Sequence, residues 1–319
     1  MANEFDLIHR YFSPLAGPEG LGLGDDAACL RVEPGFDLIV TKDMLVEGVH
    51  FFGDDPASSI AHKSLVASLS DLAAKGAMPK HYFLGLSLPS DVSDEWLAEF
   101  SDALAKLQDQ SGIRLAGGDT TRSLSGVTVS ITAMGTVPEG RMLRRSSAQV
   151  GDLVFVTGAL GDAALGLKCL EEEIEPDECL IARYRYPEAR TALGIELASF
   201  ANACADISDG LLADLGHITA ASGVGADVNL AEIPRSPTVR ELLALAPELE
   251  SCIYSGGDDY ELVFTADQSK QDDIESLCAS LGVPLAAIGC VTEKAGVRLV
   301  DQNGKLVHTG RSGFQHFET

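Results

Sequence analysis

The spacing of apolar and polar positions along this chain predicts a mixed protein of helices and strands. Apolar residues recur at helical spacing over 4–12, 58–75, 93–110 and 208–223. Apolar runs predict strands at 36–41, 81–89, 153–157 and 260–264. Residues 127–133 alternate between apolar and polar, which is typical of a half-buried antiparallel strand. Because helices and strands follow one another irregularly, the expected fold class is α/β or α+β.

Glycine-rich and polar stretches separate the predicted helices and strands. Asn303-Gly304, between short apolar segments at 297–300 and 305–308, predicts a hairpin. The stretch 138–150 contains Pro, Gly and the arginines Arg141, Arg144 and Arg145. We therefore expect an N-terminal domain at 1–138, a linker at 139–149 and a C-terminal domain at 150–319. The arginines suit a solvated linker, and their guanidinium groups also suit a phosphate clamp.

Length and composition narrow the class of protein. The chain has 319 residues, of which 45% are hydrophobic, which is enough for two domains with ordinary cores. A formal net charge of −25 argues against a nucleic-acid partner, which would need a basic surface. No apolar run approaches bilayer length, so no membrane association is expected. The seven cysteines include no C-x-x-C pair, and the N-terminus lacks a cationic segment followed by an apolar stretch. We therefore expect a cytoplasmic protein with reduced thiols, most of them in the core.

The most informative polar residues are seven aspartates in short motifs bounded by Gly, Ser or Thr. Asp43 is expected just beyond the strand at 36–41, and Asp119 in a turn after Leu115 and Ala116. Asp71 shares a helix face with small residues. The others are Asp25, Asp26, Asp206 and Asp209. Taken singly, each fits a helix cap or a turn.

Taken together, these aspartates indicate a cation site. One like-charged pair at ~4 Å costs about 4 kcal/mol at an effective dielectric of ~20. A cluster of carboxylates therefore protonates or binds cations. Oxygen ligands without Cys or His favour Mg²⁺, whose other ligands in proteins are commonly phosphates. The aspartates thus predict metal-assisted phosphoryl chemistry.

Phosphate-binding loops of other kinds are not evident. There is no Walker A loop and no protein-kinase motif set, so a phosphate site would be built from metals and carboxylates. The strand at 153–157 leads through Gly158 and Gly161 into a helix, which suits either a phosphate cradle or close helix–strand packing. His50 suits either a core position or a role facing substrate. Ser255-Gly256-Gly257-Asp258-Asp259 adds two carboxylates beside a glycine turn.

Seven motifs, in this order, resemble those of the bacterial thiamine-monophosphate kinase family. They are Gly-Asp-Asp-Ala-Ala at 24–28, Asp-Met-Leu-Val-Glu-Gly-Val-His-Phe at 43–51, Leu-Ser-Asp-Leu-Ala-Ala-x-Gly-Ala at 69–77, Gly-Gly-Asp-Thr-Thr-Arg at 117–122, Ile-Ser-Asp-Gly-Leu at 207–211, Ser-Gly-Gly-Asp-Asp-Tyr-Glu-Leu at 255–262 and Gly-Phe-x-His-Phe at 313–317. The resemblance spans about residues 4–317.

The resemblance implies a fold, an activity and a set of site residues. The fold would be of the aminoimidazole-ribonucleotide-synthetase type, with an N-terminal domain that dimerises through its sheet, a C-terminal α/β domain, and an active site between them to which the partner subunit contributes. The reaction would be direct in-line transfer of phosphate from ATP to thiamine monophosphate, with several Mg²⁺ ions and without a general base or covalent nucleophile. By motif, Mg²⁺ would be held by Asp26, Thr41, Asp43, Asp71, Asp119, Asp206 and Asp209. The nucleotide would contact Gly118, Asp119, Arg145 and Ser208, and thiamine monophosphate would contact His50, Asp258 and Phe314.

Two residues depart from the family pattern, which has Glu at the position of Asp258 and often Trp or Tyr at that of Phe314. Phe314 still suits stacking on a pyrimidine ring. Two other interpretations remain open. One is an ATP-dependent synthetase or carbamoyl-dehydrating enzyme of the same superfamily, against which the position of Cys29 and the absence of a terminal Cys argue. The other is a nucleotide- or cation-binding module without turnover.

Overall fold

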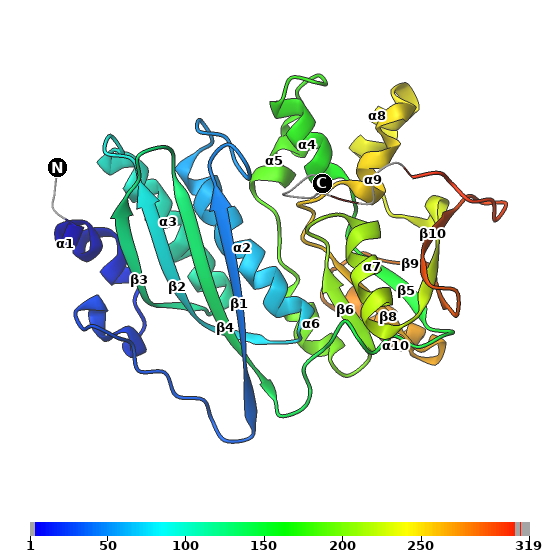
Figure 1. The fold of residues 1–319 in the computed structure, drawn as a ribbon, viewed down its shortest axis with the longest axis horizontal. Helices are drawn as coiled ribbons and strands as arrows, with labels where there is room; N and C mark the ends of the chain where they lie inside the picture. Colours follow the sequence, from blue (N-terminus) through cyan, green and yellow to red (C-terminus); the bar gives the residue numbers. More distant parts are fainter. Residues whose placement is uncertain (1–3, 310–312, 314–319) are drawn as a thin grey trace. The chain divides into compact units, whose positions relative to one another are not determined.

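The computed structural model describes residues 4–309 and Gly313 (Figure 1). The chain divides into two compact units, each described here by itself. Unit 1 holds the described residues up to Leu72 together with Ala77–Gly140. Unit 2 holds Ala73–Gly76 and the described residues from Arg141 onward. Within the described part of the chain, none of the helices combines the length and the apolar character that crossing a membrane requires.

Unit 1 is built on a four-stranded sheet in the order β1-β4-β2-β3. Its N-terminal segment comprises α1 (Glu4–Leu7), η1 (Ile8–Phe12), η2 (Ser13–Leu15) and η3 (Pro18–Leu23). The sheet and its helices are β1 (Phe36–Val46), α2 (Ala57–Ala74), β2 (Met78–Leu88), α3 (Asp94–Ser111), β3 (Arg114–Arg122) and β4 (Thr128–Pro138). β4 pairs antiparallel with β1 and β2, as its alternating pattern predicts, and β2 pairs parallel with β3.

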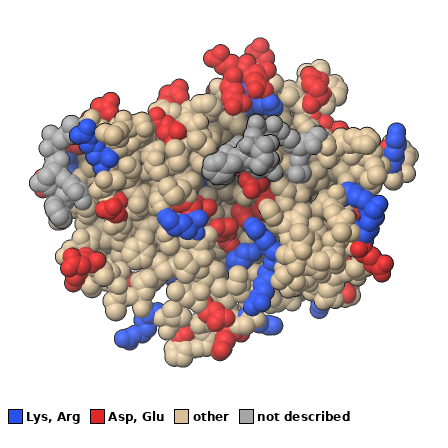
Figure 2. Space-filling model, in the orientation of Figure 1, with Lys and Arg blue, Asp and Glu red and all other residues tan. Residues whose placement is uncertain are grey.

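Helices contact one face of this sheet. Ser68 of α2 bonds to Asp43 of β1, and Gln108 of α3 donates to the hydroxyl of Tyr82 on β2. The opposite face carries the alternate residues of β1, and three of these are exposed apolar side chains: Leu38 (42% exposed), Val40 (56%) and Met44 (54%). The region of Figure 2 that corresponds to the sheet in Figure 1 is largely free of charged side chains. The sheet of unit 1 thus has one covered and one apolar, uncovered face.

Two predictions about strand ends in unit 1 are wrong. Asp43 does not follow β1 but lies inside it, paired with Ile131 of β4. Asp119 does not lie in a turn but inside β3, paired with Gly85 of β2. The reason is the same at both sites. Ladder hydrogen bonds are made by the main chain, so a strand continues through polar residues and glycines while a neighbouring strand is available.

Unit 2 contains a six-stranded sheet in the order β10-β7-β9-β5-β8-β6. Its strands are β5 (Leu153–Thr157), β6 (Ala203–Asp206), β7 (Gly225–Asn229), β8 (Leu262–Ala266), β9 (Leu285–Thr292) and β10 (Gly296–Val300). Its α-helices are α4 (Asp162–Leu170), α5 (Glu178–Arg185), α6 (Thr191–Leu197), α7 (Leu211–Ser222), α8 (Pro237–Leu245), α9 (Ser251–Ser255) and α10 (Gln271–Ser280). Short helical turns are η4 (Leu230–Glu232), η5 (Pro247–Glu250) and η6 (Gln268–Lys270).

Both faces of the unit 2 sheet are buried. Val154 and Val156 of β5 belong to one hydrophobic cluster, with residues of α4 and α7. Phe155, between them, belongs to a second cluster with residues of α6 and α10, and it stacks on Phe264 at 5.2 Å between ring centroids. Because successive strand residues face opposite sides, a sheet covered on both sides needs continuous apolar runs. This explains the apolar sequences at 153–157 and 260–264.

The predicted hairpin near the end of the described chain forms only in part. β10 ends at Val300, and the turn at Asp301–Gly304 is closed by a hydrogen bond from the N–H of Asp301 to the carbonyl of Lys305. The second arm makes a single antiparallel bridge, between Val300 and Leu306. Four of the seven cysteines are buried, as expected of small core residues: Cys169, Cys204, Cys252 and Cys278.

Helices α4 and α5 approach so closely that only glycine fits at position 166. A Cβ there would lie 2.1 Å from the carbonyl oxygen of Leu180. We therefore expect Gly166→Ala to destabilise unit 2 by about 1–3 kcal/mol, the usual cost of overpacking. The matched control is Gly216→Ala in α7, where an added Cβ meets no atom within 4 Å.

The control variant should be neutral or stabilised by about 0.5–1 kcal/mol, because alanine loses less backbone entropy than glycine in a helix. Urea unfolding of both variants, followed by circular dichroism, measures the difference. Equal midpoints for the two variants would contradict the close packing of α4 on α5.

Candidate functional site

The first group of predicted site residues lies between β1 and α2 in unit 1. Thr41 and Asp43 occupy alternate positions of β1, so their side chains share the face that α2 contacts. The hydroxyl of Thr41 donates to Asp71 Oδ2, and Ser68 Oγ donates to Asp43 Oδ2 at 2.6 Å. The structure therefore brings Thr41, Asp43 and Asp71 together, as the motifs predict.

The electrostatics of this group favour a bound cation. Burial raises the pKa of Asp43 to about 6, the Ser68 hydrogen bond opposes this shift, and the charge of Asp71 adds to it. Asp43 and Asp71 are half-buried, and the atoms they face are hydroxyl and carboxylate oxygens. A half-buried, oxygen-only set of this kind suits a hard divalent cation such as Mg²⁺.

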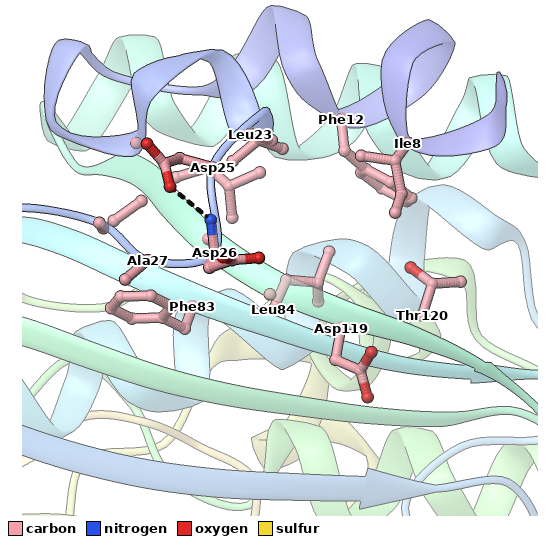
Figure 3. A pocket seen from close by; sticks show the side chains of 16 residues that line it. Ile8, Phe12, Leu23, Asp25, Asp26, Ala27, Phe83, Leu84, Asp119 and Thr120 are labelled. Carbon is pink, nitrogen blue, oxygen red and sulfur yellow. Dashed lines mark hydrogen bonds between the residues drawn. The ribbon is translucent and has the colours of Figure 1, made fainter. Parts of the chain in front are cut away.

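A second group lies where the N-terminal segment contacts β2 and β3. Asp26, Gly118 and Asp119 line one cavity of about 180 Å³ (Figure 3). Ile8 and Phe12 of η1 contribute apolar lining. Asp25 Oδ1 accepts the N–H of Asp26 at 2.8 Å, which holds the acidic turn in shape. The cavity thus combines an apolar wall with three carboxylates, those of Asp25, Asp26 and Asp119, from two distant parts of the sequence.

These two groups cannot share one ion. The strand register places Asp43, Ile131, Leu84 and Gly118 in a single row across the sheet. Three strand spacings separate the two ends of this row, or roughly 14 Å between main chains. Mg²⁺ binds its ligands at about 2.1 Å, so carboxylates at opposite ends of the row would hold different ions.

Gly118 has a structural reason to be glycine besides any contact with a nucleotide. A Cβ at this position would lie 2.0 Å from the carbonyl oxygen of Leu84. The register between β2 and β3 also shifts near this point, between Tyr82 and Phe83. Gly118 therefore allows β3 to lie against β2 next to Asp119.

His50 lies in the turn that follows β1. Its Nδ1 accepts the N–H of Val46 at 3.0 Å, and its carbonyl oxygen accepts a hydrogen bond from Lys63 Nζ at 3.1 Å. With Nδ1 acting as an acceptor, the neutral imidazole carries its proton on Nε2. The turn thus fixes both the orientation and the tautomer of the ring.

In unit 2, the predicted residues gather at the junction of β6 and α7. Asp206 ends β6 and is 3% exposed. The turn that follows contains Ser208, Asp209 and Gly210, whose φ of +117° is accessible to glycine. Asp214, one turn into α7, accepts three N–H groups of this turn through one carboxylate oxygen.

Asp214 and His217 extend the acidic group at this junction. Asp209, Asp214 and His217 each offer a ligand atom, and these atoms lie within 4.8 Å of one another. Burial and the charge of Asp209 raise the pKa of Asp214 to about 7, against the effect of backbone N–H donors and of Arg145. The junction is therefore a second place where a cation would relieve repulsion between carboxylates.

Asp258 packs against the same turn. Its N–H donates to the carbonyl of Ser208 at 2.9 Å, and its Oδ1 accepts the hydroxyl of Tyr260 at 3.0 Å. A Cβ on Gly257 would lie 2.4 Å from the Ser208 carbonyl, so glycine permits this approach. Gly313 also lies against the Asp209 carbonyl, while Phe314 falls outside the described residues.

The other two carboxylates of the 255–262 motif are structural. Asp259, 1% exposed, accepts the N–H of Gly161 at 3.0 Å. Glu261, fully buried, accepts from Thr157 at 2.6 Å and from Arg190 Nε at 2.7 Å. The N–H of Gly161, at the start of α4, is thus already bonded within the chain, so the β5–α4 junction is close packing rather than an open phosphate cradle.

Arg145 lies beside β6 because the preceding residue is held there. Arg144 forms a bridge with Ala203, and the N–H of Cys204 donates to the carbonyl of Arg144 at 3.1 Å. The side chain of Arg145 is exposed, and its charge lowers the pKa of the buried Asp214. Arg145 is therefore near the β6–α7 junction with its guanidinium accessible to solvent.

Sequence reasoning missed four residues that shape these groups: Ser68, Asp214, His217 and Tyr260. One signal was available for Asp214, which lies among Leu211, Leu212 and Leu215 on an otherwise apolar helix. A carboxylate among leucines needs donors, and the glycine turn that precedes the helix supplies them. Ser68 carries no comparable signal, because its partner, Asp43, lies on another element. Tyr260 and His217 lie within three residues of Asp258 and Asp214, but no local pattern marks these pairs.

The substitution Asp43→Asn tests how much the ionised Asp43 carboxylate destabilises the protein when no metal is bound. Because the pKa of Asp43 is raised from 3.8 to about 6, its stabilising contribution is complete below pH 3.8 and is lost as pH rises through 6. We expect Asp43→Asn in EDTA at pH 8 to be more stable than wild type by roughly 1–3 kcal/mol. The difference should shrink by about 1 kcal/mol at pH 5.

Thermal and urea unfolding at the two pH values measure this effect. Asp54→Asn, at an exposed position in the loop between β1 and α2, is the control and should leave stability unchanged at both. A less stable Asp43→Asn protein at pH 8 would show that the Asp43 carboxylate is well solvated or well paired without metal.

Comparison with known proteins confirms the family and fold that the motifs predict. The family profile of AIR synthase related protein matches residues 24–137 with its N-terminal domain and 149–302 with its C-terminal domain. Thiamine-monophosphate kinase of Escherichia coli (strain K12) is 39% identical over 324 residues, 99% of this chain and 98% of that protein. The crystal structure of thiamine-monophosphate kinase from Stenotrophomonas maltophilia K279a is 42% identical, with a TM-score of 0.86 over 96% of this chain and 98% of that one. The structure of AaThiL complexed with AMPPCP and TMP is 30% identical, with a TM-score of 0.80 over 98% and 97% of the two chains. The chain therefore belongs to the thiamine-monophosphate kinase family of the AIR synthase related proteins.

Proposed function

We propose that this protein transfers the γ-phosphate of ATP to thiamine monophosphate and so forms thiamine diphosphate and ADP. The observation that carries this proposal is the Thr41–Asp43–Asp71 group, a set of oxygen atoms that suits a hard cation in a chain of this family. AaThiL, a relative with the same fold, is complexed with AMPPCP, an analogue of ATP, and with TMP. The chain's acidic groups suit the same pair of phosphate substrates.

The residues present fit Mg²⁺. In unit 1, Asp43 and Asp71 face each other among hydroxyl oxygens, and burial, with a smaller effect of the Asp71 charge, raises the pKa of Asp43. A bound cation would offset both effects. We assign Thr41, Asp43 and Asp71 to one ion, and Asp26 and Asp119 to another. In unit 2, we assign Asp206 and Asp209 to metal binding. When bound, Mg²⁺ lowers the repulsion between the two phosphate substrates.

The chain itself supplies orientation rather than proton transfer. Ser68 holds the carboxylate of Asp43, and Thr41 holds that of Asp71, so both point to the same space. The attacking oxygen belongs to a phosphate monoester, whose second pKa is near ~6, so it is already anionic at neutral pH. No general base or covalent enzyme intermediate is needed for in-line transfer.

The remaining assignments follow the family motifs. We propose that Gly118, Asp119, Arg145 and Ser208 contact the nucleotide, and that His50, Asp258 and Phe314 contact thiamine monophosphate. Two features support the substrate assignments. The N–H of Val46 fixes the ring of His50 through Nδ1, and the hydroxyl of Tyr260 orients the shorter carboxylate of Asp258.

We also propose that the protein is a cytoplasmic homodimer formed through the sheet of unit 1. The uncovered face of this sheet carries Leu38, Val40 and Met44 with about half of each side chain exposed. An apolar face of this kind is favoured as a protein–protein contact. A second copy of the chain is the occupant that the family resemblance implies.

An endpoint assay tests the proposed reaction. The purified protein is incubated with ATP, Mg²⁺ and thiamine monophosphate, and the products are resolved by chromatography, with parallel samples that contain free thiamine, no acceptor, or EDTA. We expect thiamine diphosphate and ADP in equal amounts, only from the monophosphate and only with metal. ADP without thiamine diphosphate would indicate another acceptor, and no ADP in any sample would indicate binding without turnover.

Asp71→Asn should separate catalysis from stability. Loss of one anionic ligand should lower kcat at least ~100-fold at limiting Mg²⁺, the upper end of the range for disturbed metal sites. The unfolding midpoint should stay within a few degrees of wild type. Asp102→Asn, at an exposed position on α3, is the control and should keep wild-type kinetics. Wild-type turnover by Asp71→Asn at limiting Mg²⁺ would remove Asp71 from the metal assignment.

Charged substitutions on the uncovered sheet face should disrupt the dimer. Val40→Glu combined with Met44→Glu places four like charges across a two-fold contact, so light scattering after size exclusion should report a monomer. Leu245→Glu on α8, where the side chain is 86% exposed, is the control and should leave the dimer intact. A double variant that remains dimeric would place the interface elsewhere.

A further inference from the structure

Two helices of unit 2 begin directly after a strand and a turn that contains glycine. Helix α4 follows β5, and helix α7 follows β6. The first N–H groups of such a helix have no partner inside the helix, and together with the helix dipole they commonly bind phosphate. Each junction is therefore a place where the chain itself could hold a nucleotide phosphate.

At both junctions a buried carboxylate of the same chain binds backbone N–H groups, at the start of α4 and in the turn 208–210 that precedes α7. At α4, Asp259 accepts the N–H of Gly161 at 3.0 Å and that of Ala163 at 3.5 Å. At α7, Asp214 Oδ2 accepts from Ser208, Asp209 and Gly210 at 3.0, 3.1 and 3.2 Å. Asp214 and Asp259 are each 1% exposed, so neither carboxylate is a surface group that a ligand would readily displace.

The arrangement at α7 has a consequence for the residues just before it. Three consecutive amides converge on one oxygen, so the main chain of 208–210 wraps around Asp214 with its N–H groups turned inward. The carbonyl of Ser208 accepts a further hydrogen bond, from the backbone N–H of Asp258. The turn is thus fixed by its own backbone groups, and only side chains are left to meet a ligand.

We infer that Asp214 is a positioning residue that binds the three amides of the turn before α7 and so sets the Asp209 carboxylate to bind a cation. This inference rests on the proposed function, in which Asp209 is a metal ligand. It adds that phosphate reaches this junction through a cation or a side chain, never through the amides of 208–210. The ligand atoms of Asp209, Asp214 and His217 lie within 4.8 Å of one another, a spacing that suits a cation bound at this turn.

The experiment measures Mn²⁺ binding by electron paramagnetic resonance, with AMPPCP present, for wild type, Asp214→Ala, Asp214→Asn and Asp209→Asn. Asp214→Ala leaves three amides without their acceptor, so the turn relaxes and we expect about tenfold or greater weakening of one Mn²⁺ site. Asp214→Asn keeps a carbonyl oxygen that can accept the same N–H groups, so it should stay within about threefold of wild type.

A double-mutant cycle distinguishes positioning from an independent effect. If Asp214 acts through Asp209, the variant Asp209→Asn/Asp214→Ala should bind Mn²⁺ no more weakly than Asp209→Asn alone. Additive losses in the double variant would overturn the inference. So would wild-type Mn²⁺ binding by Asp214→Ala or by Asp209→Asn.

Asp152 is the matched control for loss of a buried structural carboxylate. It is 4% exposed and accepts the N–H of Gln149 at 2.9 Å and the side-chain amide of Asn202. Asp152→Ala should lower the unfolding temperature, as Asp214→Ala should, but leave Mn²⁺ affinity within about twofold of wild type. Weakened Mn²⁺ binding by Asp152→Ala would show that any loss of stability in unit 2 has this effect, and would overturn the inference.

Turnover of thiamine monophosphate by wild type is measured in parallel. A wild type that binds Mn²⁺ but makes no thiamine diphosphate would refute the proposed function, while the Asp214 comparison would still decide the role of that residue. An active wild type with unchanged Mn²⁺ binding in Asp214→Ala would refute the inference and leave the proposed function standing.

Discussion

A carboxylate that is removed from water needs hydrogen-bond donors or a cation, and this constraint determines where the acidic residues of the chain lie. Glu261, fully buried, is bonded to Thr157 and Arg190, and Asp214 is bonded to three backbone amides. Their needs are largely met within the chain. Asp43 is different, because it accepts the hydroxyl of Ser68 and faces the charge of Asp71 rather than a set of backbone amides. Carboxylates that donors satisfy are structural, and those that still repel one another are the candidates for cation binding.

The motif at 255–262 shows how one short sequence divides these two roles. Asp258 is half-buried and lies against the carbonyl of Ser208. Its neighbour Asp259 is buried and accepts the N–H of Gly161, just before α4. Both Asp258 and Tyr260 have positive φ values, of +67° and +52°, which L residues seldom adopt. The buried anchors on either side, at Asp259 and Glu261, hold this strained turn in place. This backbone conformation, held by the buried Asp259 and Glu261, places Asp258 next to the β6–α7 junction.

The elements of the fold were largely predictable, and their ends much less so. The predicted helices at 58–75 and 93–110 match α2 (Ala57–Ala74) and α3 (Asp94–Ser111) closely, because helical periodicity is a local property of the sequence. The predicted strand at 36–41 is too short, since β1 continues through Lys42 and Asp43 to Val46. Its length depends on β4, which lies almost a hundred residues away and pairs with it along its whole length. No local pattern carries that information.

The sequence by itself determined the class of chemistry and the family. Aspartates as the candidate ligands favour a hard cation, and seven motifs in order indicate the kinase family, because residue type and order are properties of the sequence alone. The tertiary structure decided which aspartates lie together, as candidates for binding a cation, and which support the backbone. Asp43 lies near Asp71 because β1 packs against α2. Asp214 binds three backbone amides because the glycine turn before α7 folds around its carboxylate. These two roles depend on distances and on hydrogen-bond donors from other elements, so an aspartate in the sequence is compatible with either role.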